Sequence, residues 1–321
     1  MKIYEIKNEY QTLKVLDQGA TMYQWLAYED KKNIILTNKD LKVYDGPRTG
    51  FYGNTIGRVA NRIKDGKFEI DGKVYQLNRN FAGNHGGHGG PTGFYMRTFD
   101  VIKKTDEEIV LRYLSKDGEE GYPGNLTLDV SYKLDKNQLL VTYTATTDKK
   151  TPINITNHVH FNLSEENTIL NHKLKVSANK FLDTDEFSIP SGQLIDVTNT
   201  PLDFRKEVRI GDIIEDPFLQ NSSKKGIDHN LVFEKNNHTV LLTYKNKSLK
   251  METSYPSLQI YSMNFPSGQM LTRDVIVNKY HGIAFESQYE IDAVNHPEFS
   301  NIILKPGETF KQTVTYTLEE K

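Results

Sequence analysis

The sequence contains no cysteine, a single tryptophan and no apolar run long enough to cross a bilayer. Without cysteine the chain can form no disulfide, no thiol nucleophile and no thiolate metal ligand, which suits a reducing compartment. The first ten residues, MKIYEIKNEY, include no apolar segment of signal-peptide length. We therefore expect a cytoplasmic protein with no membrane partner.

The chain also lacks an excess of one charge sign, because it contains 40 Lys and Arg residues and 42 Asp and Glu residues. Nucleic-acid binding depends on clustered basic residues that release counterions, so we expect no nucleic-acid partner. The chain has 18 Tyr and 15 Phe among its 321 residues, and 37% of its residues are hydrophobic. This is enough apolar material for a sizeable core.

Strand signals dominate the chain. Apolar and polar residues alternate between Phe310 and Leu318, and similar short runs, separated by Gly, Pro, Asn and Asp clusters, recur along the sequence. The turn dipeptides Asp65-Gly66 and Asp71-Gly72 predict two successive hairpins. A short helix is expected only between Lys206 and Ile214. With no linker or repeat, residues 1–321 predict one all-β domain, a large antiparallel β-sandwich.

Two pairs of histidines are candidates for chemistry. His85 and His88 lie in the glycine-rich segment 83–90, which predicts either close approach of the backbone to a ligand or a flexible loop whose histidines face water. His158 and His160 are two residues apart in an expected strand, so they share one face. A zinc site at this pair would need a third ligand, and none stands at a telling spacing.

Two carboxyl residues lie among apolar neighbours, where a charge is costly unless it is paired or used. Asp228 is in GIDHNL and Glu286 is in IAFESQ. A buried carboxylate facing a histidine is equipment for proton transfer. Alternatively, either carboxylate forms a structural ion pair with Arg58 or Arg62 of GRVANRI. These residues together indicate a pocket for a polar, uncharged ligand but do not name a reaction.

Taken in order, eight segments between Gly57 and Gln288 resemble the aldose 1-epimerase (galactose mutarotase) family. They are GRVANRI (57–63), the DGKVYQL hairpin (71–77), HGGPTGF (88–94), DGEEGYPG (117–124), TNHVHFNL (156–163), TPLDFR (200–205), GIDHN (226–230) and FESQ (285–288). The resemblance implies a galactose mutarotase-like supersandwich and the interconversion of the α and β anomers of a free aldose such as galactose or glucose.

Site roles follow from the same resemblance. Glu286 is expected to be the general base at the anomeric hydroxyl, and His158 the general acid at the ring oxygen. The residues expected to hold the sugar are Arg62, His88, Asp228 and Asn61. The resemblance implies no metal and no cofactor, a small sugar as partner, and a monomer or weak homodimer. With reference pKa values of about 4.3 for Glu and about 6.5 for His, Glu286 should be ionised and His158 partly protonated near neutrality.

Some positions depart from the family pattern. A second His-Gly-Gly begins at His85, so the choice of His88 rests on its spacing to Gly93-Phe94. His160 stands where the family usually has Tyr, which places a second titratable group beside His158. Phe99 stands where Trp is common, and Ile291 replaces a Pro. These changes leave the expected acid and base in place and bear on sugar preference.

Other functions remain open at this point. A sugar-binding or regulatory protein on the same fold would not need both Glu286 and His158. A disaccharide epimerase acting on maltose is a variant of the main hypothesis, and a sugar-phosphate epimerase would need an added Lys and Arg cluster. A glycoside hydrolase would use Asp228 and Glu286 as its carboxylate pair.

Overall fold

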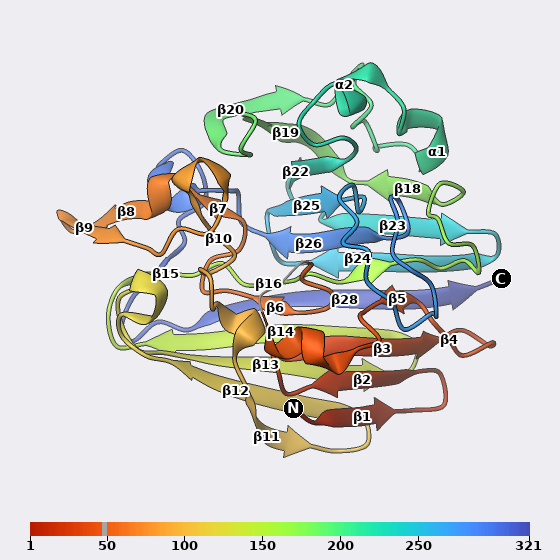
Figure 1. Ribbon diagram of the computed structural model, residues 1–321, viewed down its shortest axis with the longest axis horizontal. Coiled ribbons are helices and arrows are strands. Elements are labelled where there is room, and N and C mark those ends of the chain that lie inside the picture. The colour runs from red at the N-terminus through yellow and green to blue at the C-terminus, as the bar shows by residue number, and fades with distance from the viewer. Residues whose placement is uncertain (47–49) are drawn as a thin grey trace.

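The computed structural model describes residues 1–46 and 50–321, and two large antiparallel sheets dominate it (Figure 1). In spatial order the nine-stranded sheet contains β11 (Asp100–Lys104), β12 (Glu108–Ser115), β13 (Leu126–Asp135), β14 (Gln138–Thr147), β28 (Phe310–Glu320), β24 (Lys247–Thr253), β23 (Thr239–Tyr244), β18 (Lys173–Val176) and β21 (Val208–Arg209). The seven-stranded sheet contains β20 (Pro190–Asp196), β19 (Ala178–Thr184), β22 (Asp228–Phe233), β25 (Ser257–Tyr261), β26 (Ile283–Gln288), β17 (His160–Phe161) and β5 (Ile35–Leu36).

Smaller elements surround these sheets. A four-stranded sheet contains β1 (Ile3–Lys7), β2 (Thr12–Leu16), β3 (Thr21–Ala27) and β4 (Lys32–Asn33). Short strand pairs join β6 (Thr55–Ile56) to β16 (Thr156–Asn157), β7 (Arg62–Ile63) to β10 (Gly86–Gly87), β8 (Lys67–Ile70) to β9 (Lys73–Gln76) and β15 (Thr151–Pro152) to β27 (Ile303–Leu304). The helices are α1 (Ile210–Ile213), α2 (Pro217–Gln220) and the 3₁₀ turns η1 (Leu41–Asp45), η2 (Lys64–Gly66), η3 (Ala82–Asn84), η4 (Phe94–Met96), η5 (Glu119–Gly121) and η6 (Ala293–Asn295). Across the described part of the chain, no helix is long and apolar enough to span a membrane.

One apolar core joins the two large sheets. Strands β13, β14 and β28 bury every second side chain over most of their length, as the alternating sequence predicts. The ring centroid of Phe161, in the seven-stranded sheet, lies 5.5 Å from that of Tyr316, in the nine-stranded sheet. Trp25 of β3 packs against both rings. The all-β antiparallel sandwich expected from the sequence is therefore confirmed.

Strand β28 occupies the middle of the nine-stranded sheet. It pairs with β14 along one edge and with β24 along the other, in both cases antiparallel. These pairings join residues 310–320 to residues 138–145 and 247–253. The last strand of the chain thus connects two halves of the sheet that lie far apart in sequence (Figure 1).

Two local predictions need correction. The Asp71-Gly72 hairpin is confirmed as β8 and β9, but Asp65-Gly66 does not close a hairpin. Both of its residues adopt positive φ, as expected, within the turn η2, while β7 pairs with the distant β10 instead of β8. The predicted helix between Lys206 and Ile214 is limited to the four residues of α1, because Val208–Arg209 joins the sheet as β21.

Arg58 braces the segment that supports the site. Its side chain is buried and donates hydrogen bonds to Pro123 O at 2.7 Å, to Gly124 O at 3.1 Å and to Ser115 Oγ at 2.6 Å. The structural ion pair suggested for Arg58 with Asp228 or Glu286 is therefore wrong. The arginine holds the DGEEGYPG segment to the start of the GRVANRI segment.

Glu120, in that braced segment, holds the loop that follows His88. Its carboxylate accepts hydrogen bonds from the Thr92 backbone N–H at 2.8 Å, from the Thr92 hydroxyl and from Asn78 Nδ2 at 2.7 Å. A Cβ on Gly90 would lie 2.6 Å from the same carboxylate. The Gly90 position thus needs glycine because the loop packs tightly on Glu120.

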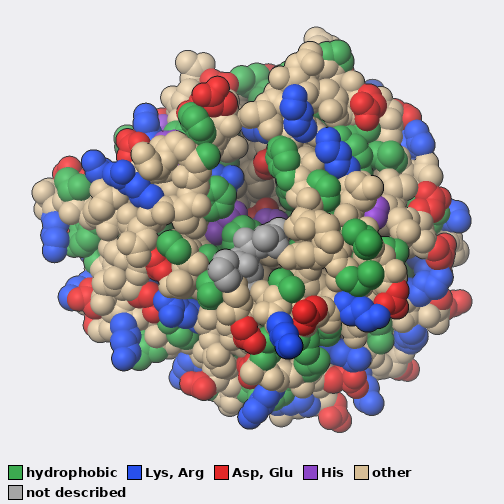
Figure 2. All heavy atoms as spheres, viewed as in Figure 1, with side chains coloured by type: hydrophobic (Ala, Val, Ile, Leu, Met, Phe, Trp, Pro, Cys, Tyr) green, Lys and Arg blue, Asp and Glu red, His purple; other side chains and the backbone are tan. Residues whose placement is uncertain are grey.

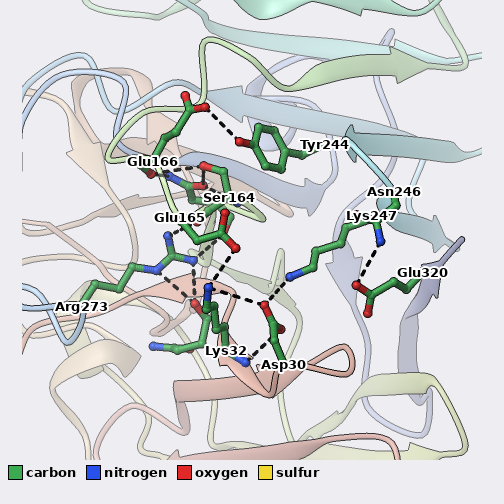
Figure 3. A network of polar contacts seen from close by, with 12 residues as sticks. Asp30, Lys32, Ser164, Glu165, Glu166, Tyr244, Asn246, Lys247, Arg273 and Glu320 are labelled. Atoms are coloured by element: carbon green, nitrogen blue, oxygen red, sulfur yellow. Dashed lines mark hydrogen bonds and ion pairs between the residues drawn. The ribbon is translucent and has the colours of Figure 1, made fainter.

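A second polar network pins the chain after His160 (Figure 3). Arg273 donates to the carbonyl oxygens of Asn33 at 2.6 Å and Ser164 at 2.9 Å, and also to that of Asn162 at 2.5 Å. Nearby, Lys247 pairs with Asp30 at 2.6 Å. The Arg273 contacts with Asn162 and Ser164 hold the segment around Arg273 against the chain that follows β17.

We expect Arg58→Met to lower the free energy of unfolding by about 3 kcal/mol or more, because several buried acceptors lose a charged donor. Arg112→Met is the matched control, since Arg112 pairs with Asp129 on the surface and its loss should cost less than about 1 kcal/mol. Urea unfolding of both variants checks this. Equal losses would show that the Arg58 contacts contribute no more than a surface pair.

Candidate active site

The outer face of the seven-stranded sheet is polar and forms the floor of a cavity. Glu286 on β26 is paired in register with Gln259 on β25, and Tyr261 is paired with Asp228 on β22. Because side chains alternate along a strand, these residues point away from the apolar core. They line a cavity of about 540 Å³, which we call the central cavity. Figure 2 shows a hollow near the middle of this face with histidine and acidic side chains inside it.

Loops from the first hundred residues form the opposite wall. The Asn61 backbone N–H donates to His88 Nδ1 at 3.3 Å, and the His88 N–H donates to Asn61 O at 2.9 Å. These two contacts set the orientation of the His88 ring beside Arg62. Arg62 Cζ lies 3.9 Å from the centroid of the Phe81 ring. The ring contacts the face of the guanidinium, so the N–H groups on the guanidinium edge remain available to polar partners.

The glycines of the His88 loop pack tightly against neighbouring segments of the protein. A Cβ on Gly89 would lie 1.7 Å from Gly57 O, and a Cβ on Gly87 would lie 2.4 Å from the Phe81 ring. The glycines therefore allow the loop to pack against the GRVANRI segment and Phe81, and this packing brings His88 into the cavity.

His158 and Glu286 form the closest ionisable pair in the cavity. His158 Nε2 lies 3.3 Å from Glu286 Oε1, and both side chains are buried. Glu286 Oε2 and His158 Nδ1 have no hydrogen-bond partner among the residues that the structure describes. The ring of His160 lies 5.0 Å from that of His158, so the predicted sharing of one face is confirmed. A paired carboxyl and imidazole with unused polar atoms can exchange protons with a bound hydroxyl.

Burial changes where the protons reside. It raises the pKa of Glu286 to about 8, with the charge of Asp228 adding to this and Arg62 opposing it. Burial lowers the pKa of His158 to about 4, and the charge of Arg62 contributes to this. The expectation from reference pKa values is therefore wrong for this site, in which burial keeps Glu286 protonated and His158 neutral at pH 7.

The same principle applies to the residues around the pair. Burial lowers the pKa of His88 and of His160 well below the ordinary value, and the neighbouring charge of Arg62 or His158 adds to the effect. Both imidazoles are thus neutral and can accept or donate a hydrogen bond. Burial also raises the pKa of Asp228, opposed by Arg62, by Lys224 and by a 2.6 Å hydrogen bond from Gln259 Nε2.

All six predicted site residues line the central cavity: Arg62, His88, Asp228, Asn61, Glu286 and His158. His85 is not among the lining residues, and its Nδ1 accepts the Asp65 N–H at 2.9 Å. Both His85 and His88 are buried, so the alternative of a loop with histidines facing water is wrong.

Sequence reasoning missed several lining residues, notably Phe51, Tyr52, Gln259 and Tyr261. Gln259 and Tyr261 are two residues apart in β25, so they lie on one face of the strand. A glutamine or tyrosine in a strand carries no chemical signal by itself. Their position opposite Glu286 and Asp228 became evident only from the strand register.

Within residues 1–46 and 50–321, no group of three or more His, Asp or Glu side chains is arranged to hold a metal ion. The donor set near His158 consists of imidazoles and one carboxyl, with aromatic rings between them. Phe51 lies 4.7 Å from His88 and 5.6 Å from His158. Such a site suits a ligand that has both apolar surface and hydroxyl groups.

The fold and the site together define a galactose mutarotase-like β-sandwich with a buried histidine and glutamate in contact in its cavity. A galactose 1-epimerase structure from Lactobacillus acidophilus superposes with a TM-score of 0.87 and 32% identity, covering 99% of this chain and 94% of that one. A GalM/aldose epimerase homologue from C. elegans gives 0.91 and 28% identity, with 99% of both chains covered.

Sequence comparisons agree with the structural ones. The family model described as aldose 1-epimerase matches residues 2–317. The aldose 1-epimerase of Escherichia coli K12 is 36% identical over 84% of this chain and 80% of its own. The galactose mutarotase of Homo sapiens is 32% identical over 98% and 92% respectively. The chain belongs to the aldose 1-epimerase family, a family of isomerases.

The raised pKa of Glu286 predicts a pH-dependent stability. The unfolded chain ionises Glu286 near pH 4.5, whereas the folded protein keeps it protonated up to about pH 8. Stability should therefore fall as the pH rises from 4.5 to 8, relative to Glu286→Gln, which cannot ionise. We expect the difference to reach several kcal/mol, since each pKa unit is worth about 1.4 kcal/mol.

Urea unfolding at pH 5, 6, 7 and 8 measures this difference. Glu290→Gln is the control, because Glu290 follows four residues later in the chain and does not line the central cavity. A constant difference between the wild type and Glu286→Gln across this range would contradict the raised pKa.

Proposed function

We propose that this protein is a mutarotase that interconverts the α and β anomers of a free aldose such as galactose or glucose. The observation that supports this most is the 3.3 Å contact between His158 Nε2 and Glu286 Oε1 in a cavity lined by polar and aromatic side chains. Family membership supports the same activity. The presence of both residues favours catalysis over a binding protein, which needs neither.

The reaction moves one proton between two sugar oxygens. Glu286 removes the proton from the anomeric hydroxyl while His158 protonates the ring oxygen. The bond between the anomeric carbon and the ring oxygen breaks, and a free aldehyde forms. Rotation about the bond to the next carbon and reclosure on the other face give the opposite anomer. On reclosure the two residues exchange roles, so the enzyme ends with its original proton count.

The pKa values give this scheme a defined starting state. At pH 7 the pair holds one proton, on Glu286. For catalysis that proton must reside on His158, and the 3.3 Å contact is short enough for the transfer. We propose that sugar binding drives the transfer, because hydroxyl donors and Arg62 stabilise the Glu286 carboxylate once the ligand displaces water.

Arg62, His88, Asp228 and Asn61 are proposed to orient the sugar. The neutral imidazole of His88 suits a hydroxyl partner, and the Arg62 guanidinium is held in place by Phe81. Phe51 and Tyr261 supply aromatic faces next to the histidines. Such faces pack on the C–H surfaces of a sugar, while the polar groups select its hydroxyls.

We further propose that residues 1–321 form one domain, which acts in the cytoplasm as a monomer or weak homodimer and without a cofactor. The single core shared by residues from Ile6 to Leu318 supports the one-domain proposal. The absence of cysteine suits a reducing compartment. Nothing in the proposed proton transfer requires a metal or nucleotide.

The pH dependence of kcat/KM tests the proton assignment. The pair is active with one proton, which it keeps from about pH 4 to about pH 8. Activity should therefore fall above pH 8 as that proton leaves, and below pH 4 as a second one binds. With ordinary pKa values the alkaline fall would begin near pH 6.5. The measurement is the enzymatic excess over spontaneous change in optical rotation of α-D-galactose.

Glu286→Gln and His158→Asn should each slow that change in rotation by about 10²-fold or more, the usual contribution of a proton-transfer group. Both variants should still bind galactose, because the orienting residues are intact. His85→Asn is the control, since His85 lies outside the central cavity. Retention of full activity in Glu286→Gln would refute the assignment of the base.

A further inference from the structure

A buried carboxyl group lies outside the central cavity, shortly after the strand that carries Glu286. The side chain of Asp292 is fully buried, and it does not line the central cavity. Its backbone φ is 56°, in the left-handed region that Asp, Asn and Gly tolerate best. A buried carboxylate is unfavourable unless its contacts compensate for the lost water. The contacts of Asp292 therefore indicate its role.

Asp292 connects the chain after β26 to the turn that follows β7. Its Oδ1 accepts a hydrogen bond from the Lys64 backbone N–H at 3.2 Å and another from Asn295 Nδ2 at 2.6 Å. Asn295 Nδ2 also donates to Lys67 O at 2.9 Å. Asp292 and Asn295 thus hold the first residue of η2 and the first residue of β8 against the chain that follows β26.

Arg62 lies in a short strand that needs such an anchor. Strand β7 contains only Arg62 and Ile63, and it pairs with the two glycines of β10. Asn61 before the strand and Asp65 after it both adopt positive φ, at 62° and 53°. A two-residue strand between left-handed positions has no long ladder of hydrogen bonds to fix it. Its position therefore depends on contacts with other segments, and Lys64 is the residue directly after it.

The Asp292 carboxyl group is ionised at pH 7. Burial raises its pKa to about 6, and the hydrogen bonds from Asn295 and from the Lys64 N–H oppose this rise. His296 Nε2 lies 3.7 Å from Asp292 Oδ2, and His296 Nδ1 lies 2.9 Å from Glu298 Oε1. An ionised acceptor forms a stronger hydrogen bond than a neutral one, so the charge of Asp292 strengthens the contact with Lys64.

We propose that Asp292 is a positioning residue for Arg62. Through Lys64 it ties the strand of Arg62 to the chain that follows the strand of Glu286. It thereby fixes the guanidinium relative to the carboxyl group that moves the proton. Asp292 lies outside the central cavity, so it acts through Arg62 and not on the sugar. This rests on the proposed mutarotase function, in which Arg62 orients the sugar and stabilises the Glu286 carboxylate.

Two substitutions separate the carboxylate from the backbone conformation. Asp292→Gly removes the side chain and tolerates the positive φ, whereas Asp292→Asn keeps an acceptor oxygen for the Lys64 N–H. We expect Asp292→Gly to lower kcat/KM for α-D-galactose about tenfold, because a displaced orienting group loses its alignment with the substrate. Galactose binding, measured by calorimetry, should weaken by a similar factor. Asp292→Asn should stay within about threefold of the wild type.

Asp71→Ala is the control for these variants. Asp71 belongs to the turn between β8 and β9, where its exposed carboxylate pairs with Lys150 at 2.7 Å. Its loss should leave both kcat/KM and galactose binding at the wild-type values, because an exposed ion pair contributes little.

The alkaline side of the pH profile distinguishes positioning from a loss of folded protein. Burial raises the pKa of Glu286, Asp228 adds to this rise and Arg62 opposes it, while the neighbouring His158 is neutral. If Arg62 moves away, the alkaline fall of kcat/KM in Asp292→Gly should shift upward by about half a pH unit. A smaller folded fraction alone would lower kcat/KM without moving that fall, and this result would contradict the proposal.

A double-mutant cycle with Arg62→Ala tests the route of the effect. If Asp292 acts through Arg62, Asp292→Gly should change galactose binding by less than about twofold in the Arg62→Ala background. The same tenfold loss in both backgrounds would overturn the proposal. Asn295→Ala is a milder variant for the same cycle, because Asn295 is exposed. It should give a smaller effect that also disappears with Arg62→Ala.

These outcomes are separate from those of the proposed function. If the wild type accelerates galactose mutarotation and Asp292→Gly matches it, Asp292 is not a positioning residue and the mutarotase function stands. If the wild type accelerates neither galactose nor glucose, the mutarotase function fails. The binding measurements on the same variants then still decide whether Asp292 acts through Arg62.

Discussion

Strands β25 and β26 of the seven-stranded sheet are buried on both of their faces, and this constraint shapes the rest of the structure. All six residues of β26 are buried, with Ile283 and Phe285 in the apolar core and Glu286 on the opposite face. A carboxyl group placed on such a strand loses its hydration, so it keeps a proton that an exposed glutamate would lose. The protonation of Glu286 thus follows from burial of its strand on both faces.

Covering the second face requires loops that hold their shape without being part of the sheet. Arg58 and Glu120 do this for the segment with His88, and Arg273 does it for the chain after His160. None of the three lines the central cavity. The two arginines of GRVANRI illustrate the division, because Arg58 is bonded to backbone carbonyls and Arg62 faces the cavity. The positions of the loops around the site therefore depend on polar contacts that lie outside the central cavity.

Local patterns in the sequence predicted the strands well and their partners poorly. Alternation between Phe310 and Leu318 located β28 to within a few residues, since it reflects burial of one face. The Asp65-Gly66 turn has the predicted backbone, yet β7 pairs with β10, because strand pairing depends on the whole fold. The six site residues were identified from the family resemblance. Gln259 and the proton positions were not, since the first depends on register and the second on desolvation.

The central place of β28 has a consequence for how the protein is made. As the ribosome releases the chain from its N-terminus, β14 emerges long before the strand that will cover its open edge. The nine-stranded sheet therefore cannot close until residues 310–320 are free of the exit tunnel. During that interval the nascent chain exposes unpaired strand edges, which other chains can join. Molecular chaperones that shield such edges should matter more for this protein than its final compact form suggests.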